Sequence, residues 1–288
     1  MDLDRLLREA LDEDLGSGDL TTEATVPADR RGHGIVRAKA DLVVCGLDVA
    51  ARVFAVTAAR LALPAPTWTS RAADGQRVPS GTVVAEVTGP TRVLLIGERL
   101  ALNLLMKLSG IASHVATYVA AAEGGTLRVV DTRKTTPLLR DLEKYAVRCG
   151  GAANHRHGLY DGVLVKDNHV DAVGSLSVAV ARARAAAHHL VRVEVEVRSL
   201  GELEEALTTA ADAVLLDNFD DASLVEAVRQ IRVRRPGLLV EASGNMTPER
   251  IAAIKGIGLD YVSAGGLVHQ ARWADLSMKV RQIEPSGQ

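Results

Sequence analysis

Residues 192–217 read RVEVEVRSLGELEEALTTAADAVLLD, and this stretch carries the pattern that decides the fold. Valine alternates with glutamate at 193–197, which is typical of a strand, and AVLLD at 213–217 is a short apolar run of strand length. Between them, apolar residues recur at helical spacing from Leu200 to Ala211. A strand, a helix and a second strand in this order predict a β/α/β unit with parallel strands.

The same unit repeats through the second half of the chain. Further strands are predicted at LRVVD (127–131), GVLVK (162–166), LLVEAS (238–243) and YVSAGG (261–266), and further helices at 137–149, 172–187, 222–233, 248–255 and 271–280. Six short strands, each followed by a helix, predict a parallel sheet covered by helices. Closure into a barrel is the commonest arrangement of so many units.

The first half has a different pattern. Apolar residues at helical spacing predict a helix over 2–15, and the glycines and polar residues of GSGDLTT (16–22) predict a loop after it. Short strand-like segments follow between residues 33 and 91, interrupted by one apolar helix at 47–61. A long helix is predicted over 97–123, with Gly110 as its weak point. The first half therefore reads as a small α+β domain.

Composition excludes several classes of protein. The 288 residues have a net charge of −2 and no run of cationic residues, which argues against nucleic acid as a partner. No apolar run of about 18 residues indicates a membrane span, and no export signal is recognisable at the start. Cys45 and Cys149 do not have the spacing of a metal site or of a disulfide framework, so we expect a soluble protein of the reducing cytoplasm.

Polar residues and glycines follow the predicted strands or lie near their carboxyl ends. They are Arg133, Lys134, Lys166, Glu196, Asp217, Ser243, Gly244, Gly265 and Gly266. Because all strand ends of a β/α barrel converge on one face, this set predicts an active site there. Glu194 shares a face with Glu196, since side chains of a strand alternate with period two. Helix capping explains any one of these residues, but not the whole set.

Two late loops and one early loop predict anion binding. SGN at 243–245 and AGG at 264–266 precede helices, where backbone N–H groups can bind a phosphate. His155 and His157 flank Arg156, and together with His169 they allow a zinc site as an alternative. Cations crowd that neighbourhood, so carboxylate binding is the better interpretation. Glu196 and Asp217 then serve as counter-charges, or hold water around a Mg²⁺ ion that stays with a phosphate substrate.

At these residues the sequence closely resembles the quinolinate phosphoribosyltransferase family. The matching segments cover nearly the whole chain: ALDEDLGSGDLTT (10–22), GERLALNLLMKLSGIAS (97–113), DTRKTTPLLRDLEKYAVRCGG (131–151), NHRHGLYDGVLVKDNH (154–169), VEVEV (193–197), LLDN (215–218), EASGN (241–245) and SAGG (263–266). The resemblance implies an N-terminal α+β sandwich domain, taken as 1–113, and an incomplete TIM-like α/β barrel, taken as 114–270. A C-terminal helix, 271–288, is expected to pack back on the first domain.

The resemblance also implies an activity: quinolinate, phosphoribosyl pyrophosphate (PRPP) and Mg²⁺ give nicotinate mononucleotide, pyrophosphate and CO₂. It implies a homodimer, or a higher oligomer, in which each active site borrows Arg99 from the partner subunit. Residue roles follow by position: Arg133, His155 and Arg156 bind the quinolinate carboxylates, Lys134 and Lys166 contact anionic groups, Glu196 and Asp217 lie by the ribose and metal, and Ser243, Gly244, Asn245, Gly265, Gly266 and His269 hold the 5-phosphate. No direct metal ligand in the protein is implied. SAGGLVHQ and Asn245 depart from the family pattern, which affects side-chain details of the phosphate loops.

Other functions are weighed beside this one. A related phosphoribosyltransferase acting on another aromatic acid would keep the fold, although three arginines favour a dicarboxylate. A Schiff-base aldolase could use Lys166 as its nucleophile, but it would leave TRK and HRH unexplained. A scaffold without catalysis would leave the strand-end charges without a role.

Overall fold

The computed structural model describes residues 2–283, and within it the chain forms two compact units. Unit 1 comprises Met1–His114, Asp141–Gly151 and Ala271–Gln288, and unit 2 comprises Val115–Arg140 and Ala152–Gln270. The first unit thus contains two segments that lie beyond residue 113 in the sequence. One of these, 141–151, falls inside the range predicted for the barrel domain.

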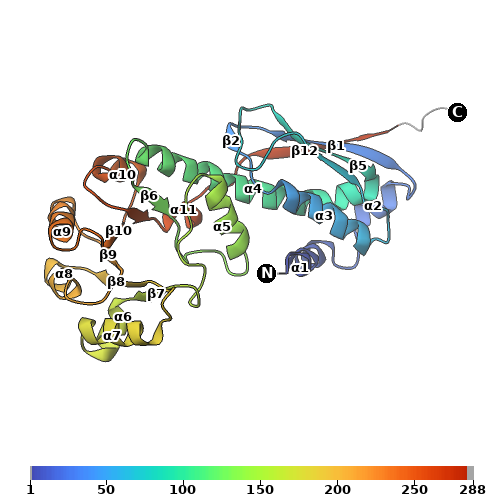
Figure 1. Cartoon of the computed structure of the whole chain (residues 1–288). Coiled ribbons are helices and arrows are strands. Elements are labelled where there is room, and N and C mark those ends of the chain that lie inside the picture. The colour runs from blue at the N-terminus through green and yellow to red at the C-terminus, as the bar shows by residue number, and fades with distance from the viewer. Residues whose placement is uncertain (1, 284–288) are drawn as a thin grey trace. The chain divides into compact units, whose positions relative to one another are not determined.

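Unit 1 is built on a four-stranded antiparallel sheet with the strand order β12-β1-β5-β3. Its elements are α1 (Leu3–Leu15), α2 (Leu20–Thr25), β1 (Arg31–Ala38), β2 (Leu42–Val43), α3 (Leu47–Arg60), β3 (Thr67–Ser70), β4 (Arg77–Val78), β5 (Val83–Pro90), most of α5 (Arg140–Cys149) and β12 (Leu276–Gln282). Helix α3 and the first part of α4 (Thr91–Ala122) lie along one face of the sheet (Figure 1). Phe54 of α3 and Val87 of β5 are buried in this core. The predicted α+β domain is confirmed.

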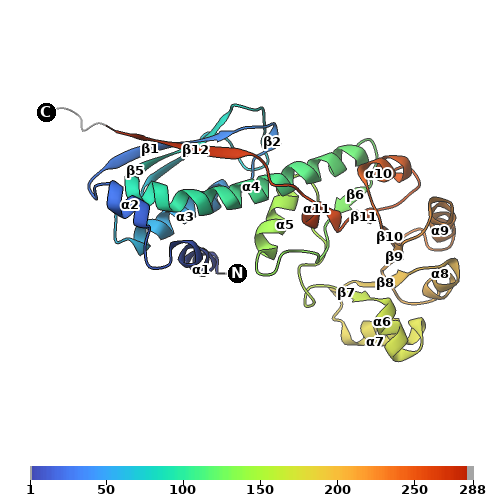
Figure 2. The same ribbon diagram turned by 180° about the vertical axis from the view of Figure 1, so that it is seen from behind.

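Unit 2 holds six parallel strands in the order β6-β11-β10-β9-β8-β7. Its elements are β6 (Arg128–Val130), β7 (Val163–Val165), α6 (Asp167–Val173), α7 (Leu176–Ala186), β8 (Val193–Val197), α8 (Leu200–Ala206), β9 (Ala213–Asp217), α9 (Asp221–Arg234), β10 (Leu239–Ser243), α10 (Pro248–Ile254), β11 (Tyr261–Ser263) and α11 (Gly266–His269). Helices α7 to α10 lie outside the curved sheet (Figure 2). Strands β6 and β7 occupy opposite edges, and within residues 2–283 no ladder joins them. The barrel is therefore incomplete, as the family resemblance implied.

Helix α4 runs without interruption through Gly110, from unit 1 into unit 2. The chain at Arg272 crosses this helix closely: a Cβ added to Gly110 would lie 2.2 Å from the carbonyl oxygen of Arg272. The backbone N–H of Ala274 also donates to the carbonyl of Met106 at 2.9 Å. Glycine is present at 110 because two backbones approach each other there.

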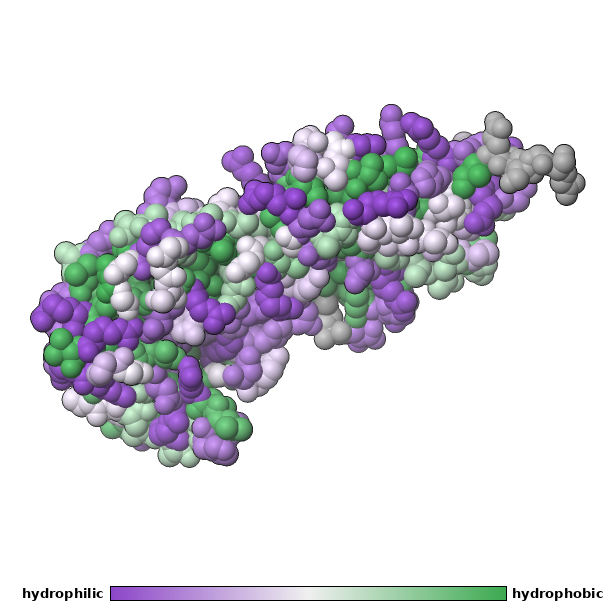
Figure 3. All heavy atoms as spheres, turned by 45° about the horizontal axis from the view of Figure 1, so that its top comes forward, coloured by the Kyte–Doolittle hydropathy of each residue, from purple (hydrophilic) through white to green (hydrophobic). Residues whose placement is uncertain are grey.

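Helix α4 is long and apolar enough to cross a bilayer by length and composition alone. Leu94, Leu105, Leu108 and Val115 of this helix are buried inside the protein. On the face shown in Figure 3, hydrophilic side chains are spread among the apolar ones. The apolar composition of α4 is therefore that of a core helix.

The predicted helix at 271–280, part of the C-terminal helix 271–288, is wrong. Residues 276–282 form β12, which pairs antiparallel with β1, while 284–288 lie outside the described residues. Leu276 and Met278 are buried and Ser277 and Lys279 are not. Leu276, Met278 and Val280 have the two-residue period of a strand, and pairing with β1 selects it over the helical interpretation.

Smaller differences have local causes. The predicted helix at 172–187 covers the end of α6 and then α7, because Gly174 adopts a left-handed conformation with φ 83° and Ser175 caps α7 by accepting from the N–H of Val178. The predicted loop at 16–22 contains the start of α2, where Asp19 accepts from the N–H groups of Thr21 and Thr22. Helix α8 ends at Ala206 and not at Ala211.

Two glycine-to-alanine substitutions test the close approach at Gly110. Alanine is the better helix former by about 0.5 kcal/mol or more, so propensity alone predicts stabilisation at both Gly110 and Gly201, which lies in α8 where a Cβ would make only an ordinary contact of 3.8 Å with Ser199 Oγ. Gly110→Ala should instead destabilise the protein by about 1–3 kcal/mol, because backbone atoms must move. Urea-denaturation midpoints of both variants measure this. A midpoint for Gly110→Ala at or above that of wild type would contradict the crossing.

Candidate active site

One pocket of unit 2, about 810 Å³ in volume, lies at the carboxyl ends of the parallel strands. Every site residue predicted from the sequence lines it except Arg99: Arg133, Lys134, His155, Arg156, Lys166, Glu196, Asp217, Ser243, Gly244, Asn245, Gly265, Gly266 and His269. Arg99 belongs to unit 1, where it is exposed and lines a separate hollow with residues of α1 and its following loop. The strand-end reasoning therefore identified the pocket.

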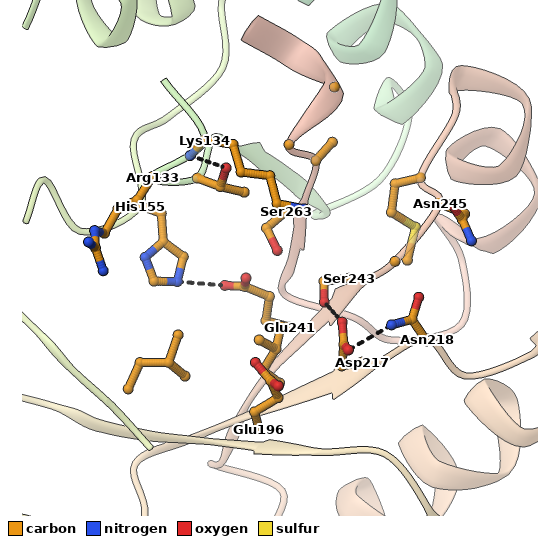
Figure 4. Close-up of a pocket in the computed structure, with 18 of the residues that line it drawn as sticks. Arg133, Lys134, His155, Glu196, Asp217, Asn218, Glu241, Ser243, Asn245 and Ser263 are labelled. Carbon is orange, nitrogen blue, oxygen red and sulfur yellow. Dashed lines mark hydrogen bonds and ion pairs between the residues drawn. The ribbon is translucent and has the colours of Figure 1, made fainter. Parts of the chain in front are cut away.

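Strand register places the carboxylates in rows. Glu196 of β8 and Glu241 of β10 are both register partners of Leu215 in β9. One row further, Ser243 pairs with Asp217 in register. Neighbours in parallel register point to the same face of a sheet, so both rows face the pocket. Figure 4 shows these side chains converging from three adjacent strands.

Buried Asp131 fixes the two cationic loops relative to each other. Its carboxylate accepts from the backbone N–H of His155 at 2.8 Å and from the side-chain amide of Asn154 at 2.7 Å. Arg140 donates to Thr135 Oγ1 at 3.0 Å and to the carbonyl of His157 at 3.1 Å, adding a second tie between the loops. The cations of residues 133–134 and 155–156 are thus held by hydrogen bonds to the fold beneath them.

His155 faces a pair of acids. Its Nε2 lies 3.3 Å from Glu194 Oε2 and 3.7 Å from Glu241 Oε2 (Figure 4 draws the second pair). Its Nδ1 accepts from the backbone N–H of Arg156 at 2.7 Å, so the ring proton resides on Nε2 and points at the acids. Burial, and then the charge of Glu194, raise the pKa of Glu241 to about 7.

Lys166 and Asp217 have defined partners. Lys166 Nζ lies 2.6 Å from Glu196 Oε2, which fixes the ammonium group at the carboxyl edge of the parallel sheet. Asp217 accepts from the hydroxyl of Ser243 and from the side-chain amide of Asn218, the latter at 2.7 Å (Figure 4). The aldolase alternative needs Lys166 as a nucleophile, whereas in this structure its ammonium group is paired with the Glu196 carboxylate.

The glycines at 244 and 265 leave room for neighbouring side chains. A Cβ at Gly265 would lie 2.6 Å from Cδ of Lys134, so the side chain of Lys134 lies over this loop. Gly244 has φ 95°, and a Cβ there would lie 2.2 Å from Oδ1 of Asn218. Arg250 joins the loops after β9 and β10 by donating to the carbonyls of Phe219 and Gly244 at 2.6 and 2.7 Å.

The sequence allowed a zinc site at His155, His157 and His169 as an alternative. His169 instead accepts from the backbone N–H of Lys166 at 2.9 Å, which caps the start of α6. Within residues 2–283, two groups bring three ligand atoms within 4.8 Å of one another: His155 with Glu194 and Glu241, and Cys45 with Asp74 and Cys149. Neither group contains His157 or His169, so the zinc alternative is not supported.

Sequence reasoning missed several polar residues of the site. Asn218 and Glu241 line the pocket, while Asp131 and Arg140 support it. A signal existed for Glu241, since it is an acid inside the apolar strand LLVEAS with the same inward phase as Ser243. Asp131 lies at a predicted strand end, but no local pattern indicates that its side chain holds the next loop.

Comparisons with known proteins identify a family for both parts of the chain. The model of the quinolinate phosphoribosyl transferase C-terminal domain matches residues 111–279, and that of the N-terminal domain matches residues 19–109. A probable nicotinate-nucleotide pyrophosphorylase [carboxylating] of Synechocystis sp. is 43% identical over 96% of this chain and 92% of its own length. The nicotinate-nucleotide pyrophosphorylase [carboxylating] of Mycobacterium leprae is 42% identical over 94% and 95%.

Solved structures extend the match to three dimensions. The crystal structure of NadC from Streptococcus pyogenes superimposes with a TM-score of 0.90 at 42% identity, covering 98% of this chain and 97% of that one. The two domain models together match residues 19–109 and 111–279, and the structural match extends over both units of the fold. The chain therefore belongs to the quinolinate phosphoribosyltransferase family.

Proposed function

We propose that the protein transfers the phosphoribosyl group of PRPP to quinolinate with loss of CO₂, giving nicotinate mononucleotide and pyrophosphate for NAD biosynthesis. The observation that carries this proposal is the pocket at the carboxyl ends of the unit 2 strands, in which two arginines and two lysines converge opposite a row of carboxylates and beside glycine loops. Family membership supports the same reaction.

The acid subsite is assigned to Arg133 and Arg156. A guanidinium group binds a carboxylate bidentately, and quinolinate carries two carboxylates. Arg156 is oriented by donating from Nη1 to the carbonyl of Gly162 at 3.0 Å. Burial and the charge of Arg133 lower the pKa of Arg156, and the charges of Glu194 and Asp161 offset this only in part, so the site still favours added negative charge. A dicarboxylate would supply that charge. Direct binding by His155 would require its Nε2 to exchange Glu194 for the ligand.

The phosphate groups are assigned to the late loops. Ser243, Gly244, Asn245, Gly265, Gly266 and His269 line that side of the pocket. Lys134 lies over Gly265, so its ammonium group can reach both the acid subsite and the phosphates. Lysine suits such a position, because its compact charge adapts to several oxygens.

Mg²⁺ is proposed to enter with PRPP. The oxygen donors of Glu196, Asp217 and Asn218 are of the kind that Mg²⁺ prefers, and they line one wall of the pocket. They fit an ion whose remaining ligands are water and phosphate oxygens, and such an ion would neutralise charge on the departing pyrophosphate. Lys166, paired with Glu196, sets the charge next to this wall.

The residues of the pocket account for catalysis by position and charge. Breaking the bond between C1 of ribose and pyrophosphate leaves positive charge on the sugar, and the pyridine nitrogen of quinolinate then bonds to C1. The resulting pyridinium takes up the electron pair released when the neighbouring carboxylate leaves as CO₂, and a proton then replaces it on carbon. Arginines that hold both carboxylates fix the nitrogen toward C1. No nucleophilic side chain is required.

Parallel assays test the activity. The purified protein should consume quinolinate in the presence of PRPP and Mg²⁺ and release CO₂ and nicotinate mononucleotide, because two arginines match two carboxylates. Nicotinate, with one carboxylate, should react poorly or not at all. Product chromatography and trapped labelled CO₂ measure the outcome. Consumption of nicotinate without quinolinate would overturn the substrate assignment.

We further propose a homodimer in the cytoplasm, in which Arg99 completes the partner's acid subsite. Arg99 is exposed and lies outside the pocket of unit 2, although the residues around it match the family at GERLALN. Two cysteines, neither spaced as part of a disulfide framework, fit a reducing compartment.

Mixing inactive subunits tests the shared site. Arg99→Ala and Lys134→Ala should each lose activity by about a hundredfold or more, since each removes charge stabilisation from the transition state. After exchange, half of the dimers are hybrids with one intact site, so recovery should approach about a quarter of wild-type activity. The exposed Lys279→Ala variant is the control and should remain active. Exchange demonstrated by mass spectrometry without recovery would refute the shared site.

Glu241, which lies beside His155 and Glu194, makes the stability of the protein depend on pH. Glu241 has a pKa of about 7 against its ordinary value of 4.5, so the native protein holds a proton there that the unfolded chain releases. This contribution to stability is complete below pH 4.5 and is lost as the pH rises toward about 7.

Glu241→Gln should remove this pH dependence, because glutamine keeps the shape but does not titrate. Relative to the variant, wild type should lose on the order of 2 kcal/mol of unfolding free energy between about pH 5 and about pH 8. Denaturation midpoints across this range provide the measurement, with the exposed Glu13→Gln as control. Parallel profiles for wild type and Glu241→Gln would show that Glu241 does not hold the proton.

A further inference from the structure

The chain has two cysteines, and unit 1 brings them together although they lie far apart in the sequence. Cys45 lies between β2 and α3, and Cys149 is the last residue of α5. Both sulfurs and a carboxylate oxygen of Asp74 lie within 4.8 Å of one another. Neither cysteine belongs to the pocket assigned to phosphoribosyl transfer.

The two thiols differ in access. Cys45 is fully buried, and its backbone is fixed on Ser109, whose hydroxyl accepts from Cys45 N–H at 2.9 Å and donates to the Cys45 carbonyl at 3.2 Å. Cys149 is only partly buried. A reagent in solution therefore reaches Cys149 first, with Cys45 behind it.

Hydrogen bonds and nearby charges shift the pKa values of the two thiols in opposite directions. The hydrogen bond with Cys45 lowers the pKa of Cys149 to about 7, and the Tyr145 hydroxyl and Arg148 act in the same direction, whereas burial and the charge of Asp74 oppose them. The hydrogen bond to Cys149 and burial raise the pKa of Cys45. Cys149 thus has the thiolate character of a reactive cysteine, while Cys45 remains a thiol.

We propose that Cys149 and Cys45 form an oxidisable dithiol, in which Cys149 reacts with peroxides and Cys45 resolves the product into an intramolecular disulfide. The Cys149 thiolate attacks one oxygen of hydrogen peroxide, breaks the O–O bond and becomes a sulfenic acid as hydroxide leaves and takes up a proton. The Cys45 sulfur then attacks the Cys149 sulfur. The hydroxyl group departs with the Cys45 proton as water, so two thiols lose two electrons and one peroxide becomes two waters.

A zinc site would use the same three side chains, but the carboxylate is already engaged. Asp74 accepts from the N–H groups of Gly46 and Leu47 at 3.0 and 3.1 Å, where it caps the start of α3, and from the Tyr145 hydroxyl at 2.8 Å. A metal would have to displace these bonds, and the nearby Arg148 adds a positive charge. Thiol oxidation needs no such displacement. In a reducing compartment, disulfides of this kind are transient and redox-sensing.

Alkylation of the whole protein after peroxide treatment tests the proposal. Untreated, denatured protein should take up two alkyl groups, one per cysteine. Protein treated with hydrogen peroxide, quenched and then denatured should take up none. Dithiothreitol should restore both, and peptide mapping should find Cys45 linked to Cys149 within one chain. Full alkylation after peroxide, or disulfides found only between chains, would overturn the proposal.

Single variants assign the two roles. Cys45→Ser should accumulate a sulfenic acid at Cys149 that dimedone traps, whereas Cys149→Ser should leave Cys45 unreactive until the protein is denatured. Because Cys45 is fully buried, Cys45→Ala with a circular-dichroism melt checks that folding is retained. Dimedone labelling at Cys45 in place of Cys149 would reverse the assignment. Stoichiometric zinc in the purified protein that protects both thiols from alkylation would replace the proposal with a metal site.

Discussion

Parallel pairing of six short strands is the constraint on which the rest of the structure depends. Parallel strands end at the same edge, so side chains distant in the sequence meet there without any contact between their own loops. Glu196 and Glu241 are both in register with Leu215, and the next row brings Ser243 to Asp217. A shift of one residue in β10 would turn Glu241 into the helical layer and away from His155. Register is therefore the determinant of the pocket's acidic wall.

The charges of the pocket are arranged in two halves. Cations come from loops that follow β6 and from Lys166 after β7, and acids come from within β8, β9 and β10. Glu196, Asp217 and Glu241 would repel one another if all three were charged and unpaired. Glu196 is paired with Lys166, and the raised pKa of Glu241 favours its neutral form. Arg133, Lys134 and Arg156 remain as the cationic side of the pocket, which suits polyanionic substrates.

The loops of the site are held in place by hydrogen bonds from supporting side chains. Asp131 is fully buried and carries the loop before His155, while Arg250 ties the turns after β9 and β10. Such supports keep cationic groups fixed before any ligand arrives, which lowers the cost of organising them during the reaction. The cysteine pair lies in the other unit, so its chemistry is separate from this set.

Much of the fold and site followed from the sequence by itself. Period-two and period-3.6 patterns gave all six parallel strands, and the residues after those strands gave the pocket, because strand ends of a parallel sheet meet by geometry. Tertiary contacts decided the remainder. The segment LSMKVRQ fits a helical or a strand period, and its pairing with β1 decides for the strand. Gly110 was predicted as a weak point of the long helix, but glycine is required there because the chain at Arg272 crosses the helix closely. Likewise, the partners of His155, Glu241 and the two cysteines depend on packing between distant segments, which no local pattern records.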